Sequence, residues 1–565
     1  MIDITRRQAV TCIAGLGAQI GLSACTFPIT PFCPTDPTIS DPSAPLTIDI
    51  HTHVFNGSDL QVQGFFNWVV LNNGSSELGA ILQELGRDFA PTAAEEMEAL
   101  QQIESATRVC DTRTSSQILQ TFAQERYSRG KEALQTAVKN VQTRRGAQSF
   151  ARSSKIERAI RDLPESYAEY QTLRRRRPRL LSSENVTDGD IDFILRNFQY
   201  RYVNVYDYLL KYSRSRSRRI DLLVAHLVDY DWPIGNGAAT PTSLRDQVTV
   251  MERISQLAGG RVLCFAPFDP MKEVAHGLGL TTESSLQLVI DAITKHGFIG
   301  VKLYPPMGFL PLDNASLDGT GFWNRRWIPQ ALQVSDLGTR MDGALRALYT
   351  WCLSNGVPIM GHSSPSNGPC DGPPNICSGL HNVFSKLTLA KHWEPVPANF
   401  PGIRVNFGHF GYTSLGHDRQ EKLFSDYMNR PSGQFLYADS AYMTDALTQQ
   451  PQLRDYLISI LRYSSGHGDA ALAQRLMYGT DWEMIVREGR TSDRYLERFE
   501  AIFESLDQLN LGADGKLSDR FFGVNAAMFL GLRKRQLNRN RLDAYYGSGP
   551  KPAWMSKVDS LAIVA

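Results

Sequence analysis

Two histidines one residue apart are the first feature of this sequence that could do chemistry. His51 and His53 stand in TIDIHTHVF, residues 47–55, among the β-branched and apolar residues that are typical of a strand. Successive side chains of a strand point to opposite faces, so we expect both imidazoles on the same face. Neutral imidazole is a common ligand of divalent metals. Two unrelated polar side chains would look the same, so the rest of the chain must decide.

Three more side chains of the metal-ligand type stand at the ends of later strand-like stretches. His362 lies in PIMGHSS, His409 in RVNFGHFG and Asp481 in RLMYGTDWE. Imidazole nitrogens and a carboxylate are a common ligand set for zinc and similar divalent ions. A catalytic site of this kind also leaves a position open for water or substrate. Small residues that leave room for a close approach are Gly408, Gly411 and Gly479.

Eight strand-like stretches are expected to position these residues. Segments of helical length separate them, and this alternation predicts a parallel sheet. Eight such units predict an α/β fold of the (β/α)8 TIM barrel type, in which catalytic side chains lie at the carboxyl ends of the strands. The histidines and the aspartate would therefore converge. The stretches are 47–55, 220–230, 262–270, 299–306, 358–364, 404–411, 435–442 and 475–483.

A large helical insertion is expected after the first strand, at residues 76–219. Good helix formers and apolar residues at helical spacing fill it, and no convincing strand appears. The barrel would then comprise residues 46–75 and 220–540, followed by a C-terminal tail, 541–565. Residues 125–219 hold 22 Lys and Arg against 11 Asp and Glu. This basic surface fits either an anionic lipid or acidic partner, or a solvated helical face.

The N-terminal residues resemble an export signal. The pair Arg6–Arg7 precedes a charge-free apolar run that is too short to span a membrane, which is similar to a twin-arginine signal. The run ends in LSAC, residues 22–25, which resembles a lipoprotein cleavage box. Cys25 would then be lipidated and would tether the protein to a membrane; the alternative is an ordinary signal that is cleaved nearby. Residues 1–25 are thus the expected signal and Pro-rich residues 26–45 the tether, with a periplasmic location.

The composition and the cysteines limit which partners and which cross-links can be expected. The chain has 565 residues and a net charge of +1, so its electrostatics make no case for a nucleic-acid partner, and none is expected. Cys264 and Cys352 fall in predicted elements and read as inert core thiols. Export permits disulfides, either across the loop CDGPPNIC, residues 370–377, or between Cys33 and Cys110.

The order HxH, Lys, His, His, Asp resembles the amidohydrolase superfamily. The stretches GVKLYPP, GHFG, YGTDWE and FFGVNAAMFLGL are similar to its amidohydrolase-related branch, which holds hydrolases and decarboxylases. The resemblance covers about residues 47–75 and 220–535. It implies that His51, His53 and Asp481 bind a divalent metal, most simply zinc, with His362 as a further ligand.

The resemblance also assigns the remaining roles. Asp481 would act as general base toward a metal-activated water, and His409 would either bind a second metal or polarise the scissile group. Asp439 would support a ligand, contact the substrate or simply cap a loop. Lys302 would contact the substrate in a one-metal site, bridge two metals as a carboxylated lysine, or pair inside the barrel. His226 and His296 are expected to be structural.

Three functions remain open at this point. The first is a hydrolase that cleaves an amide, ester or lactone bond of a small molecule, and the second is a decarboxylase that uses the same site. The third is a lipid-anchored binding protein that uses the helical insertion for a partner. A homodimer is the expectation for the oligomeric state.

Overall fold

The computed structural model describes residues 41–54, 56–61, 90–108, 112–145, 160–176, 188–212, 215–235, 237–323, 328–366, 384–415 and 420–561. The predicted signal with Cys25, most of the tether and all the cysteines of the predicted disulfides lie outside these residues. Cys264 and Cys352 are described, and both are buried free thiols. Within the same residues, no helix combines the length and the apolar character that crossing a membrane requires.

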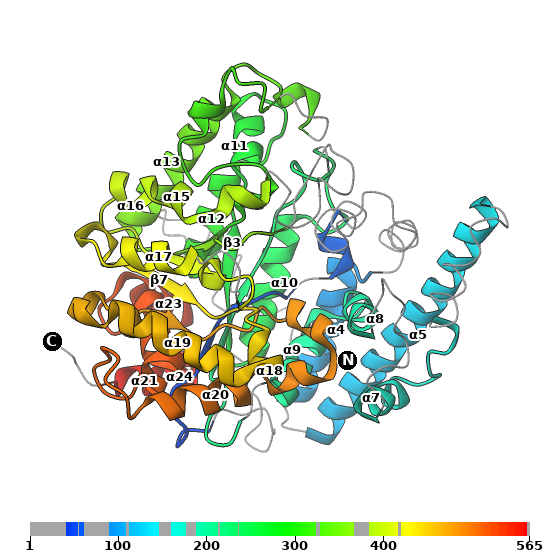
Figure 1. Cartoon of the computed structure of the whole chain (residues 1–565). Coiled ribbons are helices and arrows are strands. Elements are labelled where there is room, and N and C mark those ends of the chain that lie inside the picture. Colours follow the sequence, from blue (N-terminus) through cyan, green and yellow to red (C-terminus); the bar gives the residue numbers. More distant parts are fainter. Residues whose placement is uncertain are drawn as a thin grey trace, which may run out of the picture.

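Eight parallel strands pair in sequence order and form the barrel that the sequence predicts (Figure 1). The ring closes where the end of the eighth strand meets the first: the Ile50 amide donates to the Tyr478 carbonyl at 3.0 Å, and Thr52 pairs with Trp482. The strands are β1 Ile48–Thr52, β2 Leu222–His226, β3 Val262–Pro267, β4 Gly300–Leu303, β5 Ile359–His362, β6 Val405–Gly408, β7 Leu436–Asp439 and β8 Leu476–Met477.

The first strand contains an irregularity that the sequence pattern does not reveal. Asp49 pairs with Leu223 on β2, but Thr52 pairs with Ala225, so β1 carries an extra residue between the two pairs. Such a bulge re-aims the side chains that follow it. Ile50 packs into the apolar interior of the barrel. The next residue, His51, also faces inward, because its ring nitrogens contact side chains of β4 and β7.

The C-terminal helices close the amino end of the barrel. α23 (Leu537–Tyr546) and α24 (Ala553–Asp559) share an apolar cluster with the inward residues of the strands. The Trp554 indole donates to the Gly260 carbonyl, and the Asn538 amide donates to the Ile299 carbonyl, both at 2.8 Å. These carbonyls precede β3 and β4. The described part of residues 541–565 is therefore packed against the barrel and is not a detached tail.

The described residues of the insertion between β1 and β2 are mainly helical. In Figure 1 it lies at one side of the barrel, with α5 projecting away from it. At its base the buried Arg201 forms ion pairs with the buried Asp59 and Glu96, which ties α9 to the segment after β1. The helices are α4 Ala93–Arg108, α5 Thr112–Arg145, α7 Tyr167–Arg176, α8 Asp188–Arg196 and α9 Arg201–Lys211.

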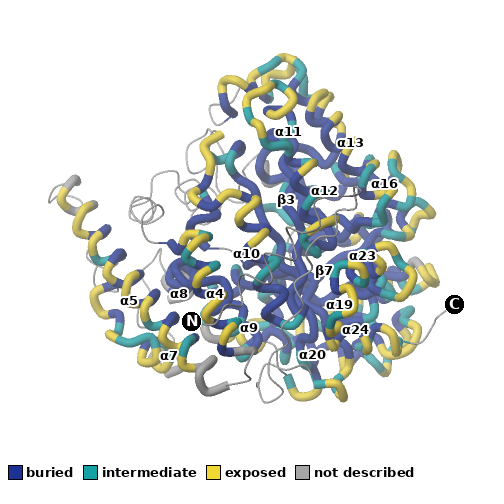
Figure 2. Tube along the Cα trace, turned by 180° about the vertical axis from the view of Figure 1, so that it is seen from behind, coloured by how far each residue is buried: buried dark blue, intermediate teal, exposed yellow. Residues whose placement is uncertain are grey.

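Helices surround the strands elsewhere, so that the strands form the buried centre of the molecule (Figure 2). The longer ones have amphipathic sequences and bury one face against the barrel. The helices of this surrounding layer are α10 Leu244–Leu257, α11 Pro270–Gly277, α12 Ser285–Lys295, α13 Leu337–Asn355, α15 Ala390–Trp393, α16 Pro395–Asn399, α17 Gln420–Met428, α18 Asp445–Thr448, α19 Gln450–Ser464, α20 Tyr495–Leu506, α21 Leu517–Asp519 and α22 Asn525–Phe529.

The close packing of the outer layer predicts the effect of one methyl group. A Cβ on Gly361 of β5 would lie 2.0 Å from the buried Trp393 ring, so Gly361→Ala forces the ring or the strand to move. We expect a loss of about 1–3 kcal/mol in the free energy of unfolding, measured by denaturant titration. The control is Gly343→Ala on the exposed side of α13, where a Cβ meets nothing within 4 Å. Better helix propensity should stabilise that variant slightly. Equal effects of the two substitutions would contradict this account.

Candidate metal centre and active-site cavity

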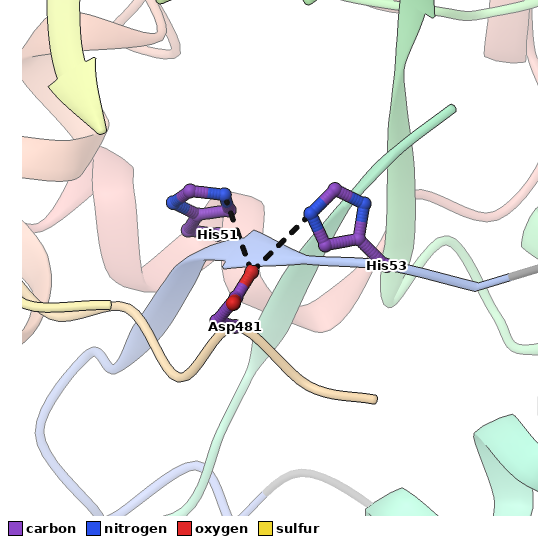
Figure 3. A group of neighbouring side chains, drawn as sticks. All are labelled: His51, His53 and Asp481. Carbon is purple, nitrogen blue, oxygen red and sulfur yellow. Dashed lines mark ion pairs between the residues drawn. The ribbon is translucent and has the colours of Figure 1, made fainter. Parts of the chain in front are cut away.

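His51, His53 and Asp481 converge at the carboxyl end of the barrel, as Figure 3 shows. The Asp481 Oδ1 atom lies 3.5 Å from Nε2 of His51 and 3.3 Å from Nε2 of His53. One ligand atom from each residue falls within 4.8 Å of the other two, which is close enough for a single ion. Among the described residues this is the only group of three such side chains. The donor set, two imidazoles and a carboxylate, fits a divalent metal.

Hydrogen bonds fix which nitrogen of each histidine faces this centre. The Nδ1 atom of His51 contacts Oδ2 of Asp439 at 3.1 Å, and Nδ1 of His53 contacts the His226 carbonyl at 3.0 Å. Because a carbonyl or carboxylate oxygen can only accept, Nδ1 carries the proton in both rings. Nε2 is then the nitrogen with a lone pair to offer a metal. Burial holds the pKa of His51 well below its usual value, so this ring is neutral at neutral pH.

Asp481 is held in a backbone conformation that few residues adopt. Its φ is 59°, in the left-handed region, and its amide donates to the His51 carbonyl at 2.8 Å. Such strain persists only where surrounding contacts enforce it, and it is frequent at functional sites. Burial alone would raise the pKa of this carboxyl. The contacts of this carboxyl with His53, His409 and His51 outweigh that effect and lower the pKa to about 2.

His362 and His409 face the same centre from β5 and from the residue after β6. Their ring centroids are 4.5 Å apart, and the His409 centroid is 4.7 Å from that of His51. His409 also contacts a carbonyl, that of Ala441, through Nδ1 at 2.9 Å. Nε2 of His362 is buried, and within the described residues it has no hydrogen-bond partner. His362 is not one of the three residues within common reach of a single ion. Its buried, unpartnered nitrogen nevertheless fits an additional ligand.

Asp439 lies behind His51 and does not reach the cavity. It is fully buried, and its Oδ2 accepts hydrogen bonds from Nδ1 of His51 and, at 2.7 Å, from the side chain of Asn406. Its Oδ1 accepts the backbone amides of His409 and Ala441 at 2.9 and 3.0 Å. This set of contacts orients two histidines. It favours ligand support over substrate contact among the alternatives that the sequence leaves open.

Lys302 also lies beneath the cavity. It is 2% exposed, and its Nζ is 3.3 Å from Nε2 of His51. Burial lowers its pKa to about 8, although the carboxylates of Asp481 and Asp439 raise it in part. Lys302 therefore lies beside a candidate ligand atom and outside the space that a substrate would enter.

Two of the glycines that the sequence analysis notes are packed against His51. A Cβ on Gly408 would lie 3.2 Å from Cε1 of His51, and a Cβ on Gly479 would lie 2.9 Å from its Cβ. The space that these small residues leave is thus filled by the ring of a candidate ligand. His226 packs against the same ring from β2, and its Nε2 lies 2.8 Å from the Ile50 carbonyl. His296 lies apart from the site and pairs with Glu252.

A cavity of about 300 Å³ opens above these residues. His53, His362, His409 and Asp481 form part of its wall, while His51 is buried behind them. This volume is at the low end for ligand sites, so it suits a small molecule. The other lining residues are Val228, Tyr230, Tyr304, Ser364, Pro365, Ser366, Tyr412, Thr413, Tyr442, Met484 and Arg487.

No motif in the sequence points to the aromatic and cationic part of this wall. The hydroxyls of Tyr304, Tyr412 and Tyr442 bond to Ser366, Asp445 and Glu488 at 2.6–2.9 Å, so these tyrosines are held in place by their own partners. All three lie in loops after strands, where only the general rule for barrels points to a site. Arg487 follows Asp481 by six residues, and no motif singles it out.

A comparison with protein-family models finds one match in this part of the chain. Residues 262–532 match the amidohydrolase family model Amidohydro_2. This range includes β3 to β8 and with them His362, His409 and Asp481. It does not include β1 with His51 and His53, or the helical insertion. A search of curated proteins finds no match.

Solved structures give distant likenesses. An amidohydrolase from Burkholderia multivorans with bound HEPES is 13% identical over 55% of this chain and 83% of its own, with a TM-score of 0.31. A probable 2-pyrone-4,6-dicarboxylic acid hydrolase from Acinetobacter baumannii is 11% identical over 55% and 84%, with a TM-score of 0.29. The IDCase of Metarhizium anisopliae is 12% identical over 55% and 75%, also with a TM-score of 0.29.

The barrel itself is established by the strand pairing of this chain. Its carboxyl end carries a histidine and aspartate group that fits a metal, next to a cavity for a small molecule. The family match covers the strands that supply one residue of that group and two of its neighbours. Together, the match over residues 262–532 and this group indicate an enzyme that is similar to the amidohydrolases.

Proposed function

We propose that the protein is a metal-dependent hydrolase that cleaves a C–N or C–O bond, of an amide, ester or lactone, in a small molecule. The observation that carries this proposal is the group of His51, His53 and Asp481, whose ligand atoms lie together beside the cavity. Nitrogen and carboxylate ligands at this spacing suit zinc, with Nε2 of His362 as a further donor. We favour one ion, and a second would require a carboxylated Lys302.

The residues around the group have distinct tasks. A bound divalent ion would supply Lewis acidity, which lowers the pKa of a water and polarises a carbonyl group. Asp481, ionised at neutral pH, takes the proton of the attacking water and returns it to the leaving group. His409, with Nδ1 bonded to a carbonyl, presents Nε2 toward the substrate's scissile group. Asp439 keeps the ring of His51 in this orientation and holds the backbone of His409.

Arg487 suggests what the substrate carries. It is half-buried, and no other residue that lines the cavity within the described chain has a permanent positive charge. A guanidinium binds a carboxylate through two parallel hydrogen bonds. We therefore infer that the substrate carries an anionic group, most simply a carboxylate. The same observation supports a second candidate, decarboxylation of a small acid at this site.

The first prediction of the proposed function concerns the metal content of the protein. The purified wild-type protein should hold about one equivalent of zinc or a similar ion after gentle purification, since ligand sites of this kind bind tightly. His53→Ala removes one ligand and should lose most of the metal, as measured by plasma emission spectroscopy. The matched control is His296→Ala, whose ring pairs with Glu252 away from the cavity. A wild-type content under about 0.2 equivalents, or a full content in His53→Ala, would refute the metal centre.

The second prediction concerns the reaction. A screen of amides, esters and lactones that carry a carboxylate should find a hydrolysed substrate. Asp481→Asn should lower kcat by about 10²–10⁴-fold, because the amide cannot accept the proton of water. The product formed in ¹⁸O-labelled water should contain the label if the reaction is hydrolysis. Release of carbon dioxide without incorporation of the label would instead establish decarboxylation.

The third prediction concerns Arg487. Arg487→Met should raise KM about tenfold or more for an anionic substrate, because a charge-assisted hydrogen bond of this kind is worth about 1.5–3 kcal/mol. For the neutral methyl ester or amide of the same compound, KM should stay within about twofold. Arg487→Lys, which keeps the charge but not the forked geometry, should give an intermediate value. Equal effects of Arg487→Met on the charged and neutral compounds would exclude this role.

A further inference from the structure

Asp49 lies on β1 two residues before His51 and joins three parts of the chain. It is fully buried, and both of its carboxylate oxygens are occupied. Oδ1 accepts the backbone amides of Thr480 at 3.0 Å and His51 at 3.3 Å. Oδ2 accepts the hydroxyls of Thr480 and Tyr208, each at 2.6 Å. A carboxylate with four donors is fixed in position, and here the donors come from β1, from the segment after β8 and from the insertion helix α9.

Three of these four donors belong to a residue of the metal centre or to its neighbour. His51 is a candidate ligand, and Thr480 directly precedes Asp481, the ligand on the opposite side. The Thr480 hydroxyl also accepts the Trp482 amide at 3.0 Å, so the residues on both sides of Asp481 are held. Asp481 itself has the strained φ described above. Strain of this kind must be maintained by neighbouring contacts, and Asp49 provides one of them on the side away from the cavity.

The helical insertion contacts the same segment through Tyr208. Besides its hydrogen bond to Asp49, Tyr208 packs its ring edge-on against the Trp482 indole, with centroids 5.0 Å apart. The Arg196 guanidinium of α8 lies 5.8 Å from the centroid of the same Trp482 ring. Tyr208, Trp482 and Asp49 are each fully buried. The insertion is thus packed directly behind two candidate ligands, although it supplies none itself among its described residues.

We propose that the insertion is a positioning element of the metal centre, in which Tyr208 acts through Asp49 to hold His51 and Asp481 at the spacing that an ion requires. This inference rests on the proposed function, because it takes these two residues as ligands. Residues that orient ligands from behind commonly change metal affinity by 10–100-fold when they are altered. If the insertion did not position the ligands, removal of the Tyr208 hydroxyl would leave the metal affinity unchanged.

The test is the zinc affinity of Tyr208→Phe, measured by competition with a chromophoric chelator. The substitution deletes only the hydroxyl and leaves the ring against Trp482. We expect the Kd for zinc to rise about tenfold or more. The melting temperature of the metal-free protein should fall only slightly, because Asp49 keeps three of its four donors. A purely structural role would show the reverse: a lower melting temperature with an unchanged Kd, and that result would overturn the inference.

Tyr212→Phe is the matched control. Tyr212 directly follows α9, four residues after Tyr208. Its ring is stacked on that of Tyr208 with centroids 5.9 Å apart, and its hydroxyl contacts Ser492 at 3.3 Å. Tyr212→Phe is the same chemical change beside the same Trp482 indole, but it leaves the hydrogen bonds of Asp49 unchanged. Its Kd for zinc should stay within about twofold of the wild-type value. A loss of affinity as large as that of Tyr208→Phe would also overturn the inference.

A double-mutant cycle tests the route through Asp49. If Tyr208 acts through Asp49, then Tyr208→Phe should cost little more when Asp49→Asn is already present. Additive losses of affinity would exclude this route. The metal measurements on His53→Ala separate the two proposals. If the wild-type protein binds zinc and His53→Ala does not, an unchanged Kd in Tyr208→Phe refutes the positioning role alone. If the wild-type protein binds none, the proposed function and this inference both fall.

Discussion

The candidate metal centre depends on one constraint, the pairing of the last strand of the barrel with the first. The Asp481 amide donates to the His51 carbonyl, which joins two candidate ligands through the backbone itself. Behind them, Asp49 and Thr480 are bonded although they lie 431 residues apart in the chain. Parallel strands in a closed ring bring such distant positions to one end. The left-handed backbone of Asp481, the bulge in β1 and the buried carboxylates are all tolerable only because this closure holds them.

Most polar groups in this centre are buried and hydrogen-bonded, with Nε2 of His362 an exception among the described residues, and this determines their chemistry. His51, His53 and His409 each direct Nδ1 to an oxygen, so each leaves Nε2 as the nitrogen with a lone pair for the metal centre. A buried imidazole without such a partner would rotate, and its donor atom would not be fixed. Asp439 and Asn406 form an outer row that makes this arrangement rigid. The cavity above has a different character, with aromatic rings and one arginine, which suits selection of a substrate more than reaction with it.

The sequence was sufficient to predict the barrel and the convergence of the main candidate residues at one end of it, for identifiable reasons. The strands are short apolar runs, and His362, His409 and Asp481 fall at or near the ends of three of them. The rule that such ends converge predicted that these residues lie together. The pattern could not reveal the bulge in β1, because it depends on register with β2. Nor could it reveal Tyr208 or Arg487, which are ordinary residues of a helix and a loop until the fold brings them to the site. Export, lipidation of Cys25 and dimerisation stay predictions.

The placement of the ligands at opposite ends of the chain has a consequence for how the enzyme matures. β1 is made early and Asp481 late, so a growing chain can expose His51 and His53 long before their partner exists. Closing a loop of this length costs conformational entropy, and no contact offsets that cost until β8 pairs with β1. Contacts between residues so far apart in the sequence also form slowly. Two histidines alone hold an ion weakly compared with the complete set. Tight metal binding is therefore expected only in the fully folded protein, in which the barrel has closed and the insertion has packed against it.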